Sequence, residues 1–141
     1  MYTANETLRA VGRMMARYAQ ERAADTAADG VIEMSALLKP WQAGESLQTG
    51  DVRVFDRQPY KCLQAHTAQE GWHPGAAPSL WGPYHAMKRA NALPYQPPTH
   101  AGDTYNTGEW MIFTDGTAYR ALRDAVDRGP DELPDSWEAE A

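Results

Sequence analysis

The stretch that decides the fold reads GESLQTGDVRVFDRQPYKCLQ and spans residues 44–64. Within it, residues 52–55 and 60–64 are rich in β-branched, aromatic and other apolar residues, and a short polar segment separates them. Two such runs around a four-residue loop are typical of a β-hairpin. Because Gly50 and Asp51 favour a turn just before the first run, we expect two short antiparallel strands in this stretch.

The same pattern returns later in the chain, at an offset of 58 to 59 residues. Eight residues of the first copy correspond in order to eight residues of the second. The first set is Gly44, Gly50, Val52, Val54, Phe55, Tyr60, Lys61 and Leu63, and the second set is Gly102, Gly108, Trp110, Ile112, Phe113, Tyr119, Arg120 and Leu122. After each hairpin, a Pro-x3-Pro-x2-Trp segment starts at Pro74 or Pro130 and ends at Trp81 or Trp137. So many matches in one order indicate an internal duplication.

Each copy is about 40 residues long, which is too short for a large apolar core. A buried aromatic side chain removes about 150–250 Å² from water, so a few large rings can replace such a core. The expected core residues are Trp41, Tyr60, Trp81, Phe55, Phe113, Tyr119 and Trp137. The prolines after each hairpin cannot donate to a strand ladder, so we expect that segment to wrap as a loop and return its tryptophan to the sheet.

The composition excludes several classes of protein. The 141 residues include 13 Lys and Arg against 19 Asp and Glu, a formal charge of −6, which argues against a general nucleic-acid binder. No run approaches the ~20 apolar residues that a membrane helix needs, so we expect no membrane partner. The single cysteine, Cys62, cannot form an internal disulfide and is expected to be a buried, inert thiol. The four histidines show no ligand spacing, so we expect no metal and no cofactor.

The first 30 residues have a helical pattern. Thr3 and Glu6 have the spacing of a capping box. Four apolar residues then follow at steps of three and four along one helix face: Leu8, Val11, Met15 and Tyr18. An isolated helix of about 20 residues is marginal in water, so this one must pack on the rest of the chain, on a second copy or on a larger assembly.

The acidic residues concentrate at the C-terminus. Residues 122–141 contain two arginines against seven Asp and Glu, a net charge of −5 (2 − 7). We interpret this segment as a solvated, partly frayed tail, with an acidic docking surface as the alternative.

The stretch YKCLQAHTAQEGWHP (residues 60–74), followed by APSLW (residues 77–81), resembles the small chitin-binding type-3 modules. These are carbohydrate-binding domains attached to chitinases, cellulases and related secreted enzymes. The upstream pattern Trp41-x2-Gly44-x5-Gly50-Asp51 fits the same family. The resemblance covers residues 40–84 well and residues 99–137 weakly.

The resemblance implies a mainly β fold with an N-terminal α-helix and two tandem small three-stranded antiparallel units of the carbohydrate-binding-module type. We expect a helical docking or oligomerisation segment at 1–38, a first unit at 39–84, a linker at 85–98, and a degenerate second unit with the acidic tail at 99–141. Similar modules also occur in tail proteins of bacteriophages and prophages, behind a helical segment. That subset implies a place in the virion tail, contacts with other tail proteins through residues 1–38, and a homo-oligomer. The N-terminus shows no secretory pattern, so synthesis in the bacterial cytoplasm is expected.

An aromatic ring that is exposed in a loop can stack on the C–H face of a sugar. Trp72 is the first candidate for ligand binding, because it lies in a Gly-Trp-His-Pro turn away from both strands; loop packing and a protein contact are the alternatives. Trp110 presents its ring if its strand face points outward, and Tyr84 and Tyr105 are candidate rim residues. His66 is a further candidate, whose alternative role is a hydrogen bond that fixes the loop.

No catalytic residue is predicted, because the sequence lacks a Ser-His-Asp order, a paired-carboxylate motif, a phosphate-binding glycine loop and an HExxH element. We therefore expect a protein that is not an enzyme. The favoured function is non-catalytic binding of a polysaccharide or cell-wall glycan by a phage tail, fibre or baseplate component. A purely structural virion protein, whose modules contact other proteins, is the alternative, and an adaptor that uses its acidic tail is a third.

Overall fold

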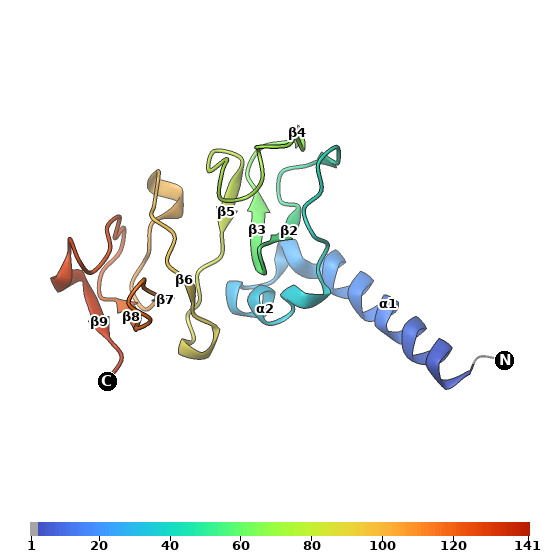
Figure 1. Ribbon diagram of the computed structural model, residues 1–141, viewed down its shortest axis with the longest axis horizontal. Coiled ribbons are helices and arrows are strands. Elements are labelled where there is room, and N and C mark those ends of the chain that lie inside the picture. The colour runs from blue at the N-terminus through green and yellow to red at the C-terminus, as the bar shows by residue number, and fades with distance from the viewer. Residues whose placement is uncertain (1–2) are drawn as a thin grey trace.

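The computed structural model describes residues 3–141 and begins with a long helix, α1 (Ala4–Arg22), ahead of several small β-sheets (Figure 1). The hydroxyl of Thr3 accepts a hydrogen bond from the backbone N–H of Glu6 at 3.1 Å, and the Glu6 carboxylate accepts one from the backbone N–H of Thr3 at 2.7 Å. This reciprocal pair confirms the predicted capping box. None of the helices within residues 3–141 combines the length and the apolar character of a membrane span.

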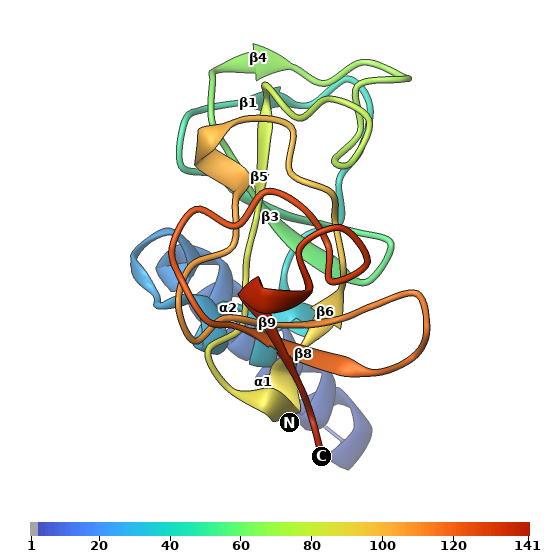
Figure 2. The ribbon, with the colours of Figure 1, turned by 90° about the vertical axis from the view of Figure 1, so that its left-hand side faces the viewer.

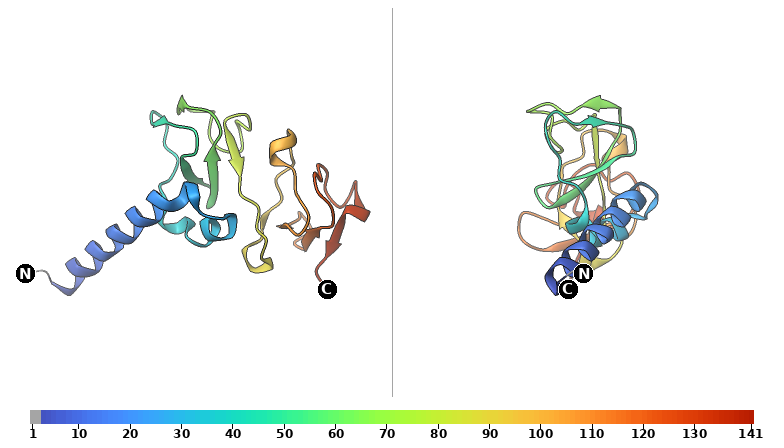
Figure 3. Two further views of the ribbon diagram at one scale, coloured as in Figure 1. Left: turned by 180° about the vertical axis from the view of Figure 1, so that it is seen from behind. Right: turned by 90° about the vertical axis from the view of Figure 1, so that its right-hand side faces the viewer.

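Only the C-terminal end of α1 packs against the rest of the molecule. There Ala19, together with Ala23 directly after the helix, is buried against Val31, Leu38 and Val52. Three short elements follow α1 along the chain: a 3₁₀ turn (Ala23–Asp25), the short helix α2 (Ala28–Glu33) and a second 3₁₀ turn (Ser35–Leu37). The N-terminal part of α1 projects away from the sheets, and the start of this helix and the C-terminus lie at opposite ends of the molecule (Figure 3).

The first sheet is the antiparallel meander β2 (Val52–Phe55), β3 (Gln58–Cys62) and β5 (Trp81–Pro83). Asp56 and Arg57 make the β2–β3 turn with φ of 50° and 65°, the left-handed geometry that two-residue hairpins need. A two-stranded ladder of β1 (Ser46–Leu47) and β4 (His66–Thr67) lies beside this sheet, at the end of the molecule away from the helices (Figure 2). The predicted hairpin is therefore present, but its turn has two residues rather than the four predicted, because the return strand begins at Gln58 instead of Tyr60 and ends at Cys62.

The second sheet has four strands: β6 (Leu93–Pro94), β7 (Trp110–Ile112), β8 (Ala118–Ala121) and β9 (Trp137–Ala139). β6 runs parallel to β7, and the other neighbours are antiparallel. β6 comes from the segment 85–98, for which the sequence predicts a linker. That prediction is wrong for residues 93–97, because the backbone of Tyr95 donates to Ile112 and its ring packs on the second core.

The C-terminal segment is also more ordered than the predicted frayed tail. Val126, Ser136 and Trp137 are buried, and β9 pairs with β8. The indole nitrogen of Trp137 donates to the carbonyl of Arg128 at 2.9 Å. The acidic side chains lie on the surface of a folded segment, because its apolar residues hold it on the sheet.

The two sheets share a set of equivalent hydrogen bonds. The N–H of Gly50 reaches the carbonyl of Cys62 at 2.8 Å, and the N–H of Gly108 reaches the carbonyl of Ala121 at 2.9 Å. Five further contacts of the first sheet have an equivalent in the second. Three are backbone hydrogen bonds: Cys62 N to Asp51 O corresponds to Ala121 N to Glu109 O, Trp41 N to Val54 O corresponds to Tyr95 N to Ile112 O, and Leu63 N to Leu80 O corresponds to Leu122 N to Ser136 O. The other two are the strand pair Cys62–Trp81, which corresponds to Ala121–Trp137, and the turn Gln48–Asp51, which corresponds to Asn106–Glu109. These contacts follow the sequence repeat, except that Tyr95, which takes the place of Trp41, comes from the segment before the second copy.

Polar contacts join the two sheets and the helices into one arrangement. The Asp29 carboxylate on α2 accepts from the backbone N–H groups of Met87 and Lys88 at 2.9 and 3.1 Å. The Gln96 amide donates to Gln58 at 2.6 Å and to the Tyr60 hydroxyl at 3.0 Å. The segment between the sheets is therefore held on both sides.

Candidate functional site

Trp72 is an exposed aromatic ring on the loop between β4 and β5. Its side chain is 43% exposed, and its backbone N–H donates to the carbonyl of Gln69 at 3.0 Å. The residues that follow it point inward: the His73 ring stacks on Phe55 with centroids 4.4 Å apart, and Pro74 is buried. The anchored neighbours thus hold the loop while the indole stays in solvent, as the sequence predicts.

His66 lies on β4 with its ring turned toward the core. Its Nδ1 is 2.7 Å from the carbonyl of Gln64, and its ring meets Trp81 edge-on with centroids 5.7 Å apart. The geometry is that of the loop-fixing hydrogen bond, the alternative role that the sequence left open for this residue.

Tyr84 and Trp110 are half-buried on different sheets. Tyr84 follows β5 and packs against the helical core, its hydroxyl is buried without a hydrogen-bond partner, and burial raises its pKa to about 12. Trp110 lies on β7, opposite Arg120, and its backbone also bridges to Ala86. Neither ring is presented in a loop as Trp72 is, so the structure does not bring these predicted residues into one site.

Tyr105 is a core residue rather than a rim residue, which corrects the sequence expectation. Only 2% of it is exposed, and its ring stacks on His85 with centroids 3.8 Å apart and an angle of 5° between the planes. Its hydroxyl accepts from the backbone N–H of Gln96 at 3.1 Å. Burial raises the pKa of Tyr105 well above its ordinary value. His85 and Gln96 come from the predicted linker, but the repeat holds a signal for this burial: at the offset of 58 residues Tyr105 corresponds to Leu47, which is buried in the first core.

The predicted core residues all belong to the two sheet cores. Tyr60, Trp81 and Trp137 are buried, and four others are half-buried against the same clusters: Trp41, Phe55, Phe113 and Tyr119. Trp41 meets Phe55 edge-on with centroids 5.9 Å apart, and Tyr95 meets Phe113 with centroids 5.4 Å apart. Large rings therefore fill both cores.

A partly buried ion pair beside the first sheet was not foreseen from the sequence. The Arg53 guanidinium donates to both oxygens of Glu45 at 2.9 and 2.8 Å, and only 8% of its side chain is exposed. The hydrogen bonds from Arg53 hold the pKa of the Glu45 carboxyl below its ordinary value. Apolar and polar residues alternate along β2, a pattern that predicts an exposed side chain for Arg53. Its carboxylate partner, Glu45, comes from the loop before β1, which the pattern on the strand does not reveal.

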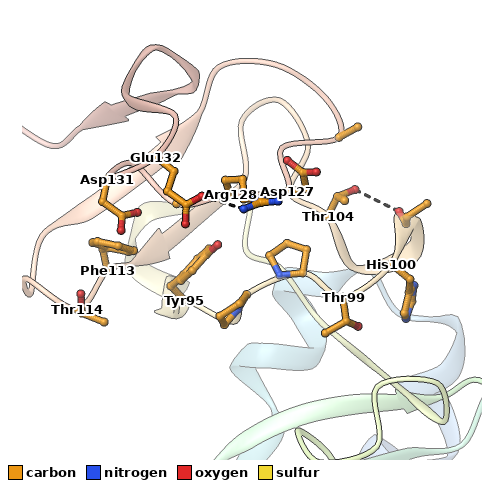
Figure 4. A pocket seen from close by; sticks show the side chains of 15 residues that line it. Tyr95, Thr99, His100, Thr104, Phe113, Thr114, Asp127, Arg128, Asp131 and Glu132 are labelled. Carbon is orange, nitrogen blue, oxygen red and sulfur yellow. Dashed lines mark hydrogen bonds and ion pairs between the residues drawn. The ribbon is translucent and has the colours of Figure 1, made fainter.

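A cavity of about 920 Å³ opens on the second sheet, between the rings of Tyr95 and Phe113 and the loop 127–132 (Figure 4). A smaller cavity of about 370 Å³ lies between the two sheets and shares Tyr95, Pro97 and Thr99 with it. No sequence motif indicates either one. Only Tyr95, an aromatic residue among prolines, could have drawn attention to this region.

Two further kinds of reactive group were considered in the part of the chain that the structure describes: metal-binding clusters and the Cys62 thiol. Within residues 3–141, no group of three His, Cys, Asp or Glu side chains is arranged to hold a metal ion. The Cys62 thiol donates to the carbonyl of Gln64 at 3.1 Å, and burial raises its pKa. A raised pKa disfavours the thiolate, which is the reactive form.

Comparison with known proteins identifies one matching stretch. The sequence model of carbohydrate-binding module family 5/12 matches residues 40–82. Chitinase Chi52 of Paenibacillus xylanexedens is 46% identical over 41 residues, which are 29% of this chain and 8% of that protein. Chitinase D of Niallia circulans and streptogrisin-C of Streptomyces griseus are each 44% identical over 41 residues, 8% and 9% of their respective lengths. The chain thus spans less than a tenth of these relatives.

Among solved structures, a family GH18 chitinase from Chromobacterium violaceum is similar over 48% of this chain and 21% of its own, with 28% identity and a TM-score of 0.35. The family match at residues 40–82 includes the first sheet, its aromatic core and the loop that presents Trp72. By sequence, that stretch is similar to carbohydrate-binding modules of family 5/12.

Proposed function

We propose that the first unit, residues 39–84, binds a β-linked polysaccharide of the chitin type without modifying it. The observation that carries this proposal is the exposed indole of Trp72, on a loop inside the stretch that matches a carbohydrate-binding module. A flat ring in solvent offers a surface for the C–H face of a pyranose. The two residues after Trp72 are anchored in the core, so the ring needs little ordering when a sugar chain binds.

The proposal assigns binding, not catalysis, to this unit. The curated relatives match over 41 residues each, a small part of their length. The remaining parts of those relatives are not matched by this chain. A single platform of this kind binds weakly, so we propose that several copies act together through avidity.

Replacement of Trp72 by alanine tests the proposed function. We expect the wild-type chain to be retained on insoluble chitin and Trp72→Ala to lose at least about fivefold in affinity, because the stacking surface is gone. Leu122→Ala is the matched control, since Leu122 is 44% exposed but lies in the second unit. A co-sedimentation assay measures retention. If the wild type fails on chitin, cellulose and bacterial cell walls alike, the proposed function is wrong.

We also propose that the chain carries two units of one kind, a complete unit at 39–84 and a reduced unit at 99–141 that borrows β6. The equivalent hydrogen bonds of the two sheets support this proposal. The second unit lacks a counterpart of the exposed Trp72: the equivalent residue, two before the first proline of the repeated segment, is Arg128.

A finer proposal concerns the assembly to which the chain belongs. We propose that copies of this chain associate through α1 and form part of a phage tail, where Trp72 faces the host surface. The support is the exposed apolar stripe of α1, in which Leu8 and Tyr18 are 69% and 59% exposed. The same stripe favours the second candidate function, a purely structural virion protein.

A further inference from the structure

The large cavity on the second sheet has two aromatic walls. The rings of Tyr95 and Phe113 meet with centroids 5.4 Å apart at an angle of 61°, and both line the cavity. Its volume of about 920 Å³ lies within the range of ligand pockets, which are lined by apolar rings and a few polar groups. The proposed function, which rests on Trp72, makes no use of this cavity.

The equivalent space of the first unit is filled. There the imidazole of His73 stacks on Phe55 at an angle of 17°. Gly129 takes the equivalent position in the second unit, directly before the first proline of the repeated segment. A Cβ atom on Gly129 would lie 2.8 Å from Phe113. The backbone of Gly129 thus lies close to the edge of the Phe113 ring. Because glycine has no side chain, no ring stacks on Phe113 from this position as His73 stacks on Phe55.

The loop beside the two rings is strongly acidic. Asp127, Asp131 and Glu132 line the cavity with a single guanidinium, that of Arg128, which pairs with Glu132 at 2.9 Å. Figure 4 shows the carboxylates of Asp131 and Glu132 above the Phe113 and Tyr95 rings. Burial and the three carboxylates together raise the pKa of Tyr95. A ligand in this cavity meets two aromatic surfaces and an excess of negative charge.

We propose that this cavity is a second sugar subsite, which binds one protonated amino-sugar unit of a glycan, such as a glucosamine unit of partly deacetylated chitin. The C–H face of the pyranose stacks on Phe113, the edge of the sugar contacts the inclined ring of Tyr95, and the ammonium group lies against the carboxylate of Asp131. Aromatic faces attract cations as well as C–H groups, so rings and carboxylates favour the same ligand. The inference rests on the proposed function, because it assumes that the chain binds a glycan of this class.

The test uses the full-length chain with short oligomers of glucosamine and of N-acetylglucosamine, and follows amide chemical shifts by NMR. With glucosamine oligomers, we expect shifts at Tyr95, Phe113 and Gly129, also in the Trp72→Ala variant. Binding there should weaken when salt is raised from about 0.01 to about 0.1 M, because the Debye length falls from about 30 to about 10 Å. N-acetylglucosamine oligomers should bind this cavity at least about fivefold more weakly.

Asp131→Asn removes the charge with almost no change of shape, and we expect it to raise the dissociation constant for the glucosamine oligomer about fivefold to tenfold. Asp135→Asn is the matched control, since Asp135 is an exposed acidic residue outside the cavity. Equal effects of the two variants, equal binding of both oligomers, or the absence of shifts around Tyr95 would each overturn the subsite. Undiminished chitin retention by Trp72→Ala would contradict only the proposed function, so the two failures are distinguishable.

Discussion

At the residue scale, equivalent positions of the sequence repeat differ between the two sheets. Arg53 on β2 is buried and paired with Glu45, whereas Met111, 58 residues later, is fully buried without a charge. A buried arginine requires its carboxylate, because an unpaired charge in the protein interior is costly. Glu45 is therefore needed for the first unit, although it looks like an ordinary surface residue in the sequence.

The Arg53–Glu45 pair leads to a prediction about stability. Glu45→Gln should lower the free energy of unfolding by about 2 kcal/mol, because it leaves the Arg53 guanidinium without its ionic partner. Urea unfolding followed by tryptophan fluorescence measures the change. Glu138→Gln is the control: its pair with Arg120 lies in solvent, so we expect a change within about 0.5 kcal/mol.

The same pair has a pH signature with a definite sign. Since Arg53 lowers the pKa of Glu45 below its ordinary value of 4.5, the unfolded chain binds the proton more readily than the folded one. The stabilisation is complete above pH 4.5 and is lost as the pH falls through the lower, folded pKa. The gap between wild type and Glu45→Gln should therefore shrink in acid. A gap that does not change with pH contradicts the prediction.

At the scale of single elements, α1 is the one whose apolar face remains uncovered along most of its length. Val11, Met14 and Met15 are 45%, 63% and 54% exposed, and Ala19 is the only buried residue of the helix. These apolar residues line an open groove that continues to Met34 and Leu37. The spacing of the stripe alternates three and four residues, which is the spacing of helix pairing.

This face predicts self-association of the full-length chain. Met15→Glu places a charge in the middle of the stripe and should shift the protein to monomer, because a carboxylate cannot be buried there unpaired. Arg13→Glu, on the opposite face of α1, is the matched control and should keep the oligomer. Size-exclusion chromatography with light scattering measures the mass. A wild-type chain that is monomeric at high concentration disproves association through α1.

At the scale of the whole molecule, the position of the second sheet depends on a few polar contacts. The carboxylate of Asp29 accepts hydrogen bonds from Met87, Lys88 and Asn91. Gln96 holds the other side of the connection through Gln58 and Tyr60. These contacts fix the segment that enters β6, and hence the orientation of the cavity beside Tyr95.

Asp29→Ala should release this segment from the helices. We expect the amides of Met87 and Lys88 to exchange with solvent at least about tenfold faster, because their acceptor is lost, while the amides of β3 remain protected. Hydrogen exchange followed by NMR measures both. Asp25→Ala changes an exposed aspartate of the preceding turn and should leave these amides as they are. Unchanged protection of Met87 in Asp29→Ala would show that other contacts hold the segment.

Local sequence was sufficient for the features that depend on neighbours in the chain. The Thr3–Glu6 capping box, the hairpin at 52–62 and the exposure of Trp72 follow from capping, turn chemistry and the Gly-Trp-His-Pro order, because each involves residues a few positions apart. The aromatic core residues could also be predicted from the sequence, because segments of about 40 residues have few other side chains with which to exclude water.

Long-range packing decided the rest. His85 and Tyr95, from the segment predicted as a linker, stack on Tyr105, and Glu45 pairs with the buried guanidinium of Arg53. The cavity beside Phe113 exists because glycine stands where the first unit has a stacked histidine. Periodicity and spacing describe which residues share a strand or a helix face, but the contacts between distant segments are established only when the chain packs in three dimensions.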